Sequence, residues 1–353
     1  MASEAPSCKV VLAKNIANGL LQEVHEGLKT LGKKPHLVGF LANADPAARI
    51  GFQYTRRDVD KEEIEEAILA ANADDSIDGI IVYYPIFNTR QDQYLQQIVD
   101  VSKDVEGLSH RYVFNMYQNI RFLDENLSAD GSKGNVSGGE TGRQKSILPC
   151  TPLAIVKILE YLRVYNTILP YGDRLHGHTI CVVNRSEVVG RPLAALLAND
   201  GACVYSVDLT GVQKFTRGEG LKKRRHEVED LEGWTIKDAA PLCDVVITGV
   251  PGEKYKFDTS LLRGGAVCIN FSSEKNFGPE VKEKASIYVP SIGKVTIVVL
   301  LRNLLVSLLL SSVLTYADSY DRESSKTARL RKHRFLLLKR RYGVKMMFNV
   351  YVL

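Results

Sequence analysis

The candidate functional residues of this sequence lie mainly in the stretch Thr179–Asp208. A short β-branched run, Ile180–Val183, is followed by the polar loop Asn184–Arg185–Ser186, and Gly190–Arg191–Pro192 then opens a helix. The backbone N–H groups of such a loop can bind the pyrophosphate of a dinucleotide. Asp208 ends the next apolar run, where a carboxylate can accept hydrogen bonds from an adenosine ribose.

The glycine fingerprint of dinucleotide-binding loops is incomplete here, because the loop reads N-R-S-E-V-V-G and not G-x-G-x-x-G. On the residues alone, a dinucleotide site and a generic doubly wound unit both stay open. Asp208 favours NAD because it would repel a 2′-phosphate, whereas Arg185 would attract one. The alternative for Asp208 is an acid at the surface end of a strand.

Alternating apolar runs and helical patterns predict the elements that position these residues, in two α/β domains. In the first domain we expect helices at 15–29, 62–71 and 91–99 and strands at 36–41 and 79–84. Thr151 is predicted to cap a connecting helix over 152–165. The second, Rossmann-like domain is predicted to have strands at 179–183, 202–207, 245–248, 266–269 and 287–289, with a helix at 193–199. The Gly/Ser-rich segment 127–144 and the charged segment 222–232 are expected to be solvated connections.

Composition describes an ordinary globular chain. Of the 353 residues, 45 % are hydrophobic and 25 % charged, and the net charge is +5. Residues 318–353 alone carry about +7, so the body is slightly acidic and we expect no nucleic-acid binding. The six cysteines show no C-x-x-C pair and no metal-like spacing, so we predict a reducing compartment and no metal. No signal peptide is evident, and a cytoplasmic protein is expected.

Five motifs carry a resemblance to one family. Asn184–Leu197 is similar to the G-R-S-x-x-V-G-x-P-x-x-x-L-L motif of the methylenetetrahydrofolate dehydrogenase/cyclohydrolase family. Four more stretches match in order: Asn43–Ala47, Lys103–Leu108 (KDVEGL), Pro149–Pro152 (PCTP) and Val289–Asn303. With Tyr83, Asn184 and Gly293–Lys294, the chain resembles the fungal-type, monofunctional, NAD-dependent branch.

The resemblance implies a function in one-carbon metabolism and purine biosynthesis, the oxidation of 5,10-methylenetetrahydrofolate to 5,10-methenyltetrahydrofolate with NAD. It implies a folate-binding domain at 1–150, a linker helix and NAD-binding domain at 151–294 and a return helix at 295–316, with the active site in a cleft between the domains. The substrate is expected to be polyglutamylated and the protein to be a homodimer without membrane attachment.

The expected site residues fall into two groups. The substrate group is Tyr83, Pro85, Glu106, Thr151, Pro152, Ser291 and Ile292, with Cys150 as the catalytic candidate. The cofactor group is Asn184, Arg185, Ser186, Gly190, Asp208, Leu209, Thr248, Gly249, Val250, Asn270 and Phe271.

Several of these residues also have structural alternatives. Cys150 precedes a helix, where a thiol's pKa is lowered, but it can equally be packed. Tyr83 stands where bifunctional relatives carry Gln, and Glu106 where they carry the Asp that contacts the pterin. The structural alternative for Tyr83 is packing against the sheet, and that for Glu106 is an acid in a turn. Thr248 can be only a strand-end hydroxyl.

Two departures from the family limit the resemblance. After Asp45–Ala48 the family continues into a helix with Tyr-x-x-x-Lys, whose lysine is central to cyclohydrolase chemistry. Here Arg49–Ile50 runs straight into Gly51–Tyr54, which looks like the following strand. We therefore predict no cyclohydrolase activity, with a catalytically impaired NAD-binding relative as the alternative.

The second departure is the basic tail 317–353, which matches nothing in the family. One hypothesis is that the tail and the absence of the helix are both artefacts of the gene model or of splicing. A weaker one makes the tail an anchor to membranes or nucleic acid. The apolar run 295–314 is long enough for a membrane span, but Arg302–Asn303 in its middle favours the return helix.

Overall fold

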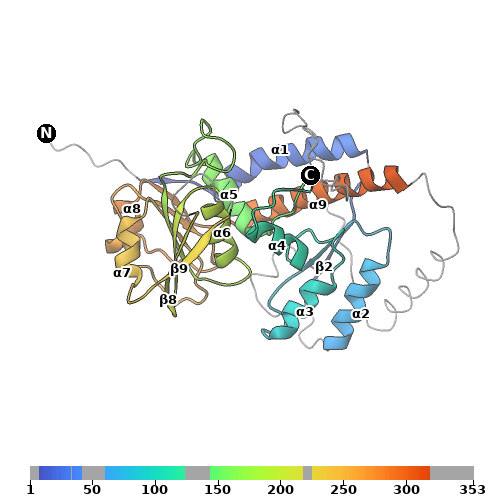
Figure 1. The fold of residues 1–353 in the computed structure, drawn as a ribbon, viewed down its shortest axis with the longest axis horizontal. Helices are drawn as coiled ribbons and strands as arrows, with labels where there is room; N and C mark the ends of the chain where they lie inside the picture. Colours follow the sequence, from blue (N-terminus) through green and yellow to red (C-terminus); the bar gives the residue numbers. More distant parts are fainter. Residues whose placement is uncertain (1–7, 33, 42–59, 124–143, 218–224, 319–353) are drawn as a thin grey trace, which may run out of the picture. The chain divides into compact units, whose positions relative to one another are not determined.

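A computed structural model describes residues 8–32, 34–41, 60–123, 144–217 and 225–318. The chain divides into two compact units, and Figure 1 labels many of their helices and some of their strands. Unit 1 comprises Met1–Glu23, Phe114–Ile120 and Pro149–Val299, and unit 2 comprises Val24–Val113, Arg121–Leu148 and Leu300–Leu353.

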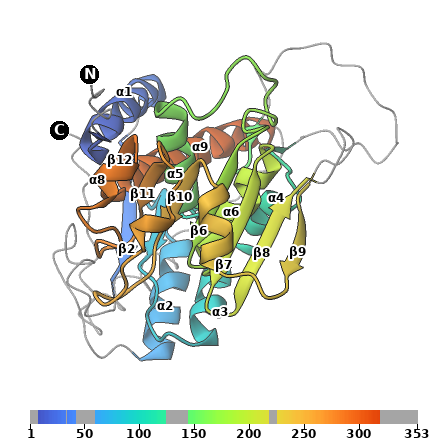
Figure 2. The same ribbon diagram turned by 90° about the vertical axis from the view of Figure 1, so that its left-hand side faces the viewer.

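Unit 1 is built on an eight-stranded sheet with the order β1-β12-β11-β10-β6-β7-β8-β9, whose strands lie side by side in Figure 2. The first six strands of that order run parallel, whereas β8 and β9 pair antiparallel at the edge. The bounds are β1 Lys9–Val10, β6 Thr179–Val183, β7 Cys203–Asp208, β8 Gly211–Thr216, β9 Glu227–Leu231, β10 Val245–Thr248, β11 Val267–Asn270 and β12 Ile287–Val289.

Helices cover both faces of this sheet, which explains why its central strands are apolar on both sides. Helix α6 (Gly190–Asn199) packs on β6, β7 and β8, and α5 (Cys150–Tyr161) packs on α6. On the other face, α7 (Ile236–Ala239), η2 (Ala240–Leu242) and α8 (Val281–Lys284) cover a core that includes Cys181 and Val183. A third short helix, η3 (Thr259–Leu261), precedes β11.

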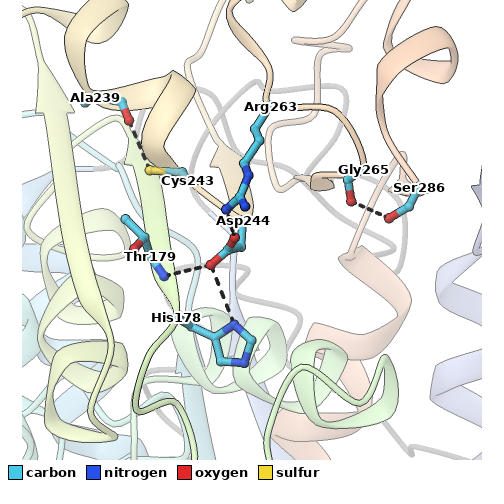
Figure 3. A network of polar contacts seen from close by, with 8 residues as sticks. All are labelled: His178, Thr179, Ala239, Cys243, Asp244, Arg263, Gly265 and Ser286. Atoms are coloured by element: carbon cyan, nitrogen blue, oxygen red, sulfur yellow. Dashed lines mark hydrogen bonds and ion pairs between the residues drawn. The ribbon is translucent and has the colours of Figure 1, made fainter.

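The amino-terminal edge of this sheet is tied together by Asp244, as Figure 3 shows. Its carboxylate accepts a hydrogen bond from the backbone N–H of Thr179 at 3.2 Å and pairs with Arg263, and His178 Nδ1 lies 3.8 Å away. Next to it, the Cys243 thiol donates to the carbonyl of Ala239. These bonds hold the starts of β6 and β10 in register.

Unit 2 has a two-stranded parallel sheet, β2 (Leu37–Phe40) and β3 (Gly79–Val82), packed against α2 (Lys61–Asn72) and α3 (Arg90–Ile98). A two-stranded antiparallel ladder joins β4 (Phe122–Leu123) to β5 (Gln144–Lys145). Three further helices, α1 (Ala13–Leu31), α4 (His110–Tyr117) and α9 (Gly293–Asp318), contribute residues to both units.

The KDVEGL motif builds part of unit 2. Lys103 Nζ donates to the carbonyls of Ala71, Asn72 and Asp74 and so satisfies the end of α2. The buried Asp104 accepts from the N–H groups of Gly107 and Ser109. The first two positions of the motif are therefore structural.

Asn303 on α9 also has a structural role, and the apolar run around it forms a helix as predicted. Its amide donates to the carbonyls of Val105 and Leu148 at 3.0 and 2.9 Å. In the part of the chain that the structure describes, no helix combines the length and the apolar character needed to cross a membrane.

Most predicted elements are confirmed to within a few residues, with two corrections and some elements that were not predicted. Thr151 does not cap α5, because the helix already begins at Cys150 and Pro149 occupies the cap position without a side-chain bond. Within 222–232, Glu227–Leu231 is a strand and not a plain connection, because it pairs with β8. Helix α4 and strand β8 were not predicted. The expectations for 43–54, for 127–143 and for the tail from 319 lie outside the described residues.

Candidate active site

The carboxyl-terminal ends of β6 and β10 are joined by Asn184. Its backbone has φ +89°, a left-handed conformation that Asn tolerates better than most residues. The side-chain amide donates to the carbonyl of Gly249 at 2.6 Å. The strand order reverses between β6 and β10, which is the place where open α/β sheets bind ligands. Asn184 therefore links the two loops that border the expected cofactor site.

The loop after β6 is wound tightly onto the start of α6. Ser186 accepts the N–H of Gly190 on its hydroxyl at 3.3 Å and the N–H of Arg191 on its carbonyl at 3.0 Å. A Cβ on Gly190 would lie 1.7 Å from the carbonyl oxygen of Asn184, so only glycine fits there. The backbone can then approach an anion closely at the amino end of α6.

Asp208 organises the neighbouring loop after β7. One carboxylate oxygen accepts the N–H of Arg185 at 2.8 Å, and the other accepts the N–H of Leu209 at 2.6 Å. Each carboxylate oxygen has a second acceptor site. The sequence-predicted role for Asp208 as an acceptor of ribose hydroxyls thus fits its geometry, and the fully exposed Leu209 side chain lies directly after it.

Arg185 is half-buried and already engaged. Its guanidinium donates to the carbonyl of Gly211 at 2.6 Å, while Nε is buried without a hydrogen-bond partner among the described residues. Burial lowers the pKa of this guanidinium, and the charges of Asp208 and Asp230 act in the opposite direction. Gly211 and Asp230 were not predicted from the sequence, because no motif marks them.

Two buried polar groups stand at the ends of β10 and β11, where Thr248 and Asn270 are directly paired in the ladder. The hydroxyl of Thr248 and the side-chain oxygen of Asn270 have no hydrogen-bond partner in the described part of the chain. Such groups are costly unless something else satisfies them. The side-chain amide of Asn270 is fixed, since it donates to the carbonyls of Ser272, Glu274 and Pro290.

The loop after β10 is held by close packing. A Cβ on Gly249 would lie 1.9 Å from the Phe271 ring. Asn276, which the sequence analysis missed, accepts the N–H of Val250 at 2.8 Å and donates to its carbonyl at 2.9 Å. The predicted cofactor residues Thr248, Gly249 and Val250 are thus fixed against the loop after β11.

Cys150 and its neighbours begin α5. Cys150 is buried with its Sγ 3.9 Å from the hydroxyl of Thr151, and Pro152 follows in the first turn. Ser291 is exposed and Ile292 is buried, just before α9. All five residues belong to unit 1.

The remaining substrate candidates lie in unit 2 around the end of β3. Glu106 accepts the backbone N–H of Val82 at 2.9 Å, and burial raises the pKa of Glu106 to about 8, helped by the charge of Asp104. The Tyr84 hydroxyl, which the sequence analysis passed over, is buried without a described hydrogen-bond partner. Burial, reinforced by Glu106, raises the pKa of Tyr84.

Tyr83 and Pro85 follow directly after the end of β3. Tyr83 is half-buried and donates its N–H to the carbonyl of Phe40, and the Tyr84–Pro85 peptide is cis. The loop that follows is held by the buried Asp92, which accepts the N–H groups of Ile86, Phe87 and Asn88. Within the described ranges, no group of three His, Cys, Asp or Glu side chains could hold a metal ion.

A sheet with an acid at the end of β7 and a glycine-bounded loop at the point where the order of its parallel strands reverses defines a dinucleotide-binding α/β domain. Comparison with known proteins gives the family. The model of the tetrahydrofolate dehydrogenase/cyclohydrolase catalytic domain matches residues 47–106, and that of the NAD(P)-binding domain matches 149–218. The chain belongs to the tetrahydrofolate dehydrogenase/cyclohydrolase family.

Individual relatives agree with this assignment. Methylenetetrahydrofolate dehydrogenase [NAD(+)] of Schizosaccharomyces pombe is 55% identical over 312 residues, which cover 85% of this chain and 92% of the relative. The Saccharomyces cerevisiae protein of the same name is 54% identical over 318 residues, covering 84% and 95%. The solved structure of the Saccharomyces cerevisiae NAD-dependent enzyme has a TM-score of 0.75 and 52% identity, covering 87% of this chain and 99% of that one.

These relatives give no support to the alternative of a catalytically impaired protein.

Proposed function

We propose that this protein oxidises 5,10-methylenetetrahydrofolate to 5,10-methenyltetrahydrofolate with NAD in one-carbon metabolism. The main support is the identity of more than half of the aligned residues to NAD-dependent methylenetetrahydrofolate dehydrogenases over nearly their full length. The loops of unit 1 supply an independent reason, because they combine an anion-binding turn with an acid suited to ribose hydroxyls.

The residues of unit 1 fit the cofactor. Asp208 would accept the adenosine ribose hydroxyls, and the turn Asn184–Ser186 with Gly190 would hold the pyrophosphate. Thr248 and Asn270 offer a hydroxyl and a carbonyl oxygen, both buried and without described partners, to a carboxamide. When bound, NAD supplies the acceptor for a hydride from the one-carbon bridge of the substrate.

The protein's own contribution is orientation and the exclusion of water. The positive charge that develops on the substrate spreads over its two ring nitrogens, so no covalent nucleophile is required. Cys150 therefore serves to border the substrate and not to attack it. In unit 2, Glu106 with its raised pKa can offer either a proton or an acceptor to the pterin ring beside Tyr83 and Pro85.

We also propose that the enzyme lacks cyclohydrolase activity. The sequence has no counterpart of the family's Tyr-x-x-x-Lys helix, and Tyr83 replaces the glutamine expected to assist that lysine. General acid–base assistance of this kind is worth about 10²–10⁴-fold in rate. Hydrolysis of methenyltetrahydrofolate faster than in buffer, abolished by heating the protein, would contradict the proposal.

Other features are proposed from the chain's chemistry and its family. The six cysteines are free, which suits a reducing compartment such as the cytoplasm. We also propose a polyglutamylated substrate, a homodimer, a folate-binding region around 1–150 and a dinucleotide-binding region around 151–294.

The decisive experiment is a direct assay of purified full-length protein with methylenetetrahydrofolate and NAD. NADH should form, and formation should depend on both substrates. NADH binding without turnover would instead indicate a protein that binds the dinucleotide but has lost the dehydrogenase reaction.

A further inference from the structure

The β8–β9 hairpin places polar groups beside Arg185 on the face of the sheet that α6 covers. Ser206, Gln213 and Asp230 are direct neighbours across β7, β8 and β9, so their side chains share one face. Asp208 and Gly211 form the next pair on the same face. The hairpin therefore extends the surroundings of Asp208 by two strands that the dinucleotide motif itself does not include.

Arg185 is hydrogen-bonded to the β8–β9 hairpin. Its guanidinium donates to the carbonyl of Gly211 at the start of β8. Asp230 is held in place by Gln213, whose amide donates to the Asp230 carboxylate at 2.8 Å. Both Asp208 and Asp230 act on Arg185 as favourable negative charges. The Gly211 carbonyl thus holds the guanidinium by a hydrogen bond, and two carboxylates attract this cation, which lies next to the ribose-binding acid.

We propose that the β8–β9 hairpin helps to select NAD over NADP by engaging Arg185, and that Asp230 is a specificity-determining residue outside the dinucleotide loop. This inference rests on the proposed function. An arginine beside the acid after the second strand ordinarily accommodates a 2′-phosphate. Here a 2′-phosphate would have to displace the Gly211 carbonyl and would meet two carboxylates, so Asp208 and Asp230 reject it together.

The size of the effect follows from exposure. Asp230 is exposed, so its attraction to Arg185 is screened by water and is worth at most about 1 kcal/mol. This corresponds to about a fivefold change in an equilibrium constant. Glu229 gives a matched control, because it lies on the same strand but faces the other side and pairs with Lys214 at 3.7 Å.

The test is fluorescence titration of the full-length protein with NADH and with NADPH. Asp230→Asn should tighten NADPH binding about three- to fivefold and change NADH binding less than about twofold. Glu229→Gln removes the same charge and should leave both affinities within about twofold. If both substitutions change NADPH affinity equally, the effect comes from the net charge of the protein and not from Asp230 in particular, and the inference is overturned.

A second variant tests whether Arg185 carries the effect. Arg185→Gln is made both in the parent and in the Asp230→Asn background, and NADPH affinity is compared within each pair. In the Asp230→Asn background, the same substitution should remove the gain in NADPH affinity. A gain that survives without Arg185 would contradict the proposal, and thermal melting would verify that each variant is folded. If the parent binds neither dinucleotide, the proposed function itself is wrong.

Discussion

The two edges of the unit 1 sheet each carry an aspartate at a strand end, and the two are used differently. Asp244 at the amino-terminal edge is matched by a backbone N–H, by Arg263 and by the nearby His178 (Figure 3). Among the described residues, Asp208 at the carboxyl-terminal edge accepts two backbone N–H bonds and lies near a guanidinium that is bonded elsewhere. A carboxylate paired with a cation holds the fold, whereas one bound only by amides keeps its charge for a ligand.

The same contrast extends to the groups around each aspartate. At the carboxyl-terminal edge, Thr248 and Asn270 keep buried oxygens without described partners. At the amino-terminal edge, Cys243 and Ser286 donate to nearby carbonyls. Unsatisfied buried groups cost stability, so their position on one edge indicates where a ligand is expected.

Glycine substitutions at the two edges should give the largest difference in NADH affinity. In Gly249→Ala the new methyl group would meet the Phe271 ring at 1.9 Å, and overpacking costs about 1–3 kcal/mol. NADH affinity should fall about 10–100-fold, because the loop after β10 must move. Gly264→Ala at the other edge is the control, since its Cβ would meet nothing within 4 Å. Equal losses of NADH affinity in both variants would break the comparison.

The aspartates give the next largest effect. Asp208→Ser should weaken NADH binding about tenfold and reduce the difference in affinity between NADH and NADPH. The reason is that hydrogen bonds to charged groups are worth about 1.5–3 kcal/mol, whereas serine keeps only a neutral hydroxyl. Asp244→Ser should leave NADH affinity unchanged and lower the free energy of unfolding by about 1–2 kcal/mol. Titration and urea denaturation of both variants measure the two quantities. A larger loss of NADH affinity in Asp244→Ser would reverse the assignment of the edges.

A smaller effect is expected at Asn184. Asn184→Gly removes the hydrogen bond to the Gly249 carbonyl but suits the φ of +89° better. We expect the KM for NAD to rise about threefold while the melting temperature holds or increases. Asn184→Ala loses the bond and also strains the backbone, so it should lower the melting temperature as well. An unchanged KM in both variants would show that the link between the loops has no role in binding.

The smallest predicted effect concerns pH and lies in unit 2. The pKa of Glu106 in the folded protein is about 8, above its ordinary value of 4.5, so the folded state holds this proton more tightly than the unfolded state does. Stability from this group is therefore present at low pH and is lost as the pH rises toward about 8.

Glu106→Gln should flatten this dependence. Between about pH 6 and pH 8.5, the melting temperature of the parent should fall about 2–4 °C more than that of the variant. The exposed Glu66 on α2 provides the control substitution, Glu66→Gln, which should keep the slope of the parent. Parallel slopes for the parent and Glu106→Gln would show that Glu106 is ionised in the folded protein throughout this range.

The parallel part of the sheet could be predicted because its strands are continuous apolar runs, such as Ile180–Val183, buried by helices on both faces. Strand β9 could not be predicted, because an exposed edge strand needs no apolar pattern and three of the five residues of Glu227–Leu231 are acidic. Its pairing with β8 is set by the fold. The cap at Thr151 was also wrong, since α5 begins two residues earlier than the pattern indicated.

Prediction of the candidate site from the sequence was limited in the same way, because the sequence shows local features but not tertiary partners. Asp208 could be singled out because its place after a predicted strand is local information. The bond from Asn184 to Gly249 joins residues 65 positions apart, and the partners of Arg185 lie on β8 and β9. No sequence pattern gives the desolvated surroundings of the half-buried Glu106, on which its raised pKa depends. The residue types could be read, but their partners depended on tertiary pairing.

The KDVEGL motif has a consequence for how unit 2 opens. Lys103 bonds the last carbonyls of α2, Asp104 shapes the turn, and Glu106 bonds the last N–H of β3. The end of α2, the turn and the end of β3 are thus all bonded to side chains of one short run. Local opening of any one of them would break bonds of the others, so α2, the turn and the end of β3 should exchange their amide hydrogens as one cooperative unit.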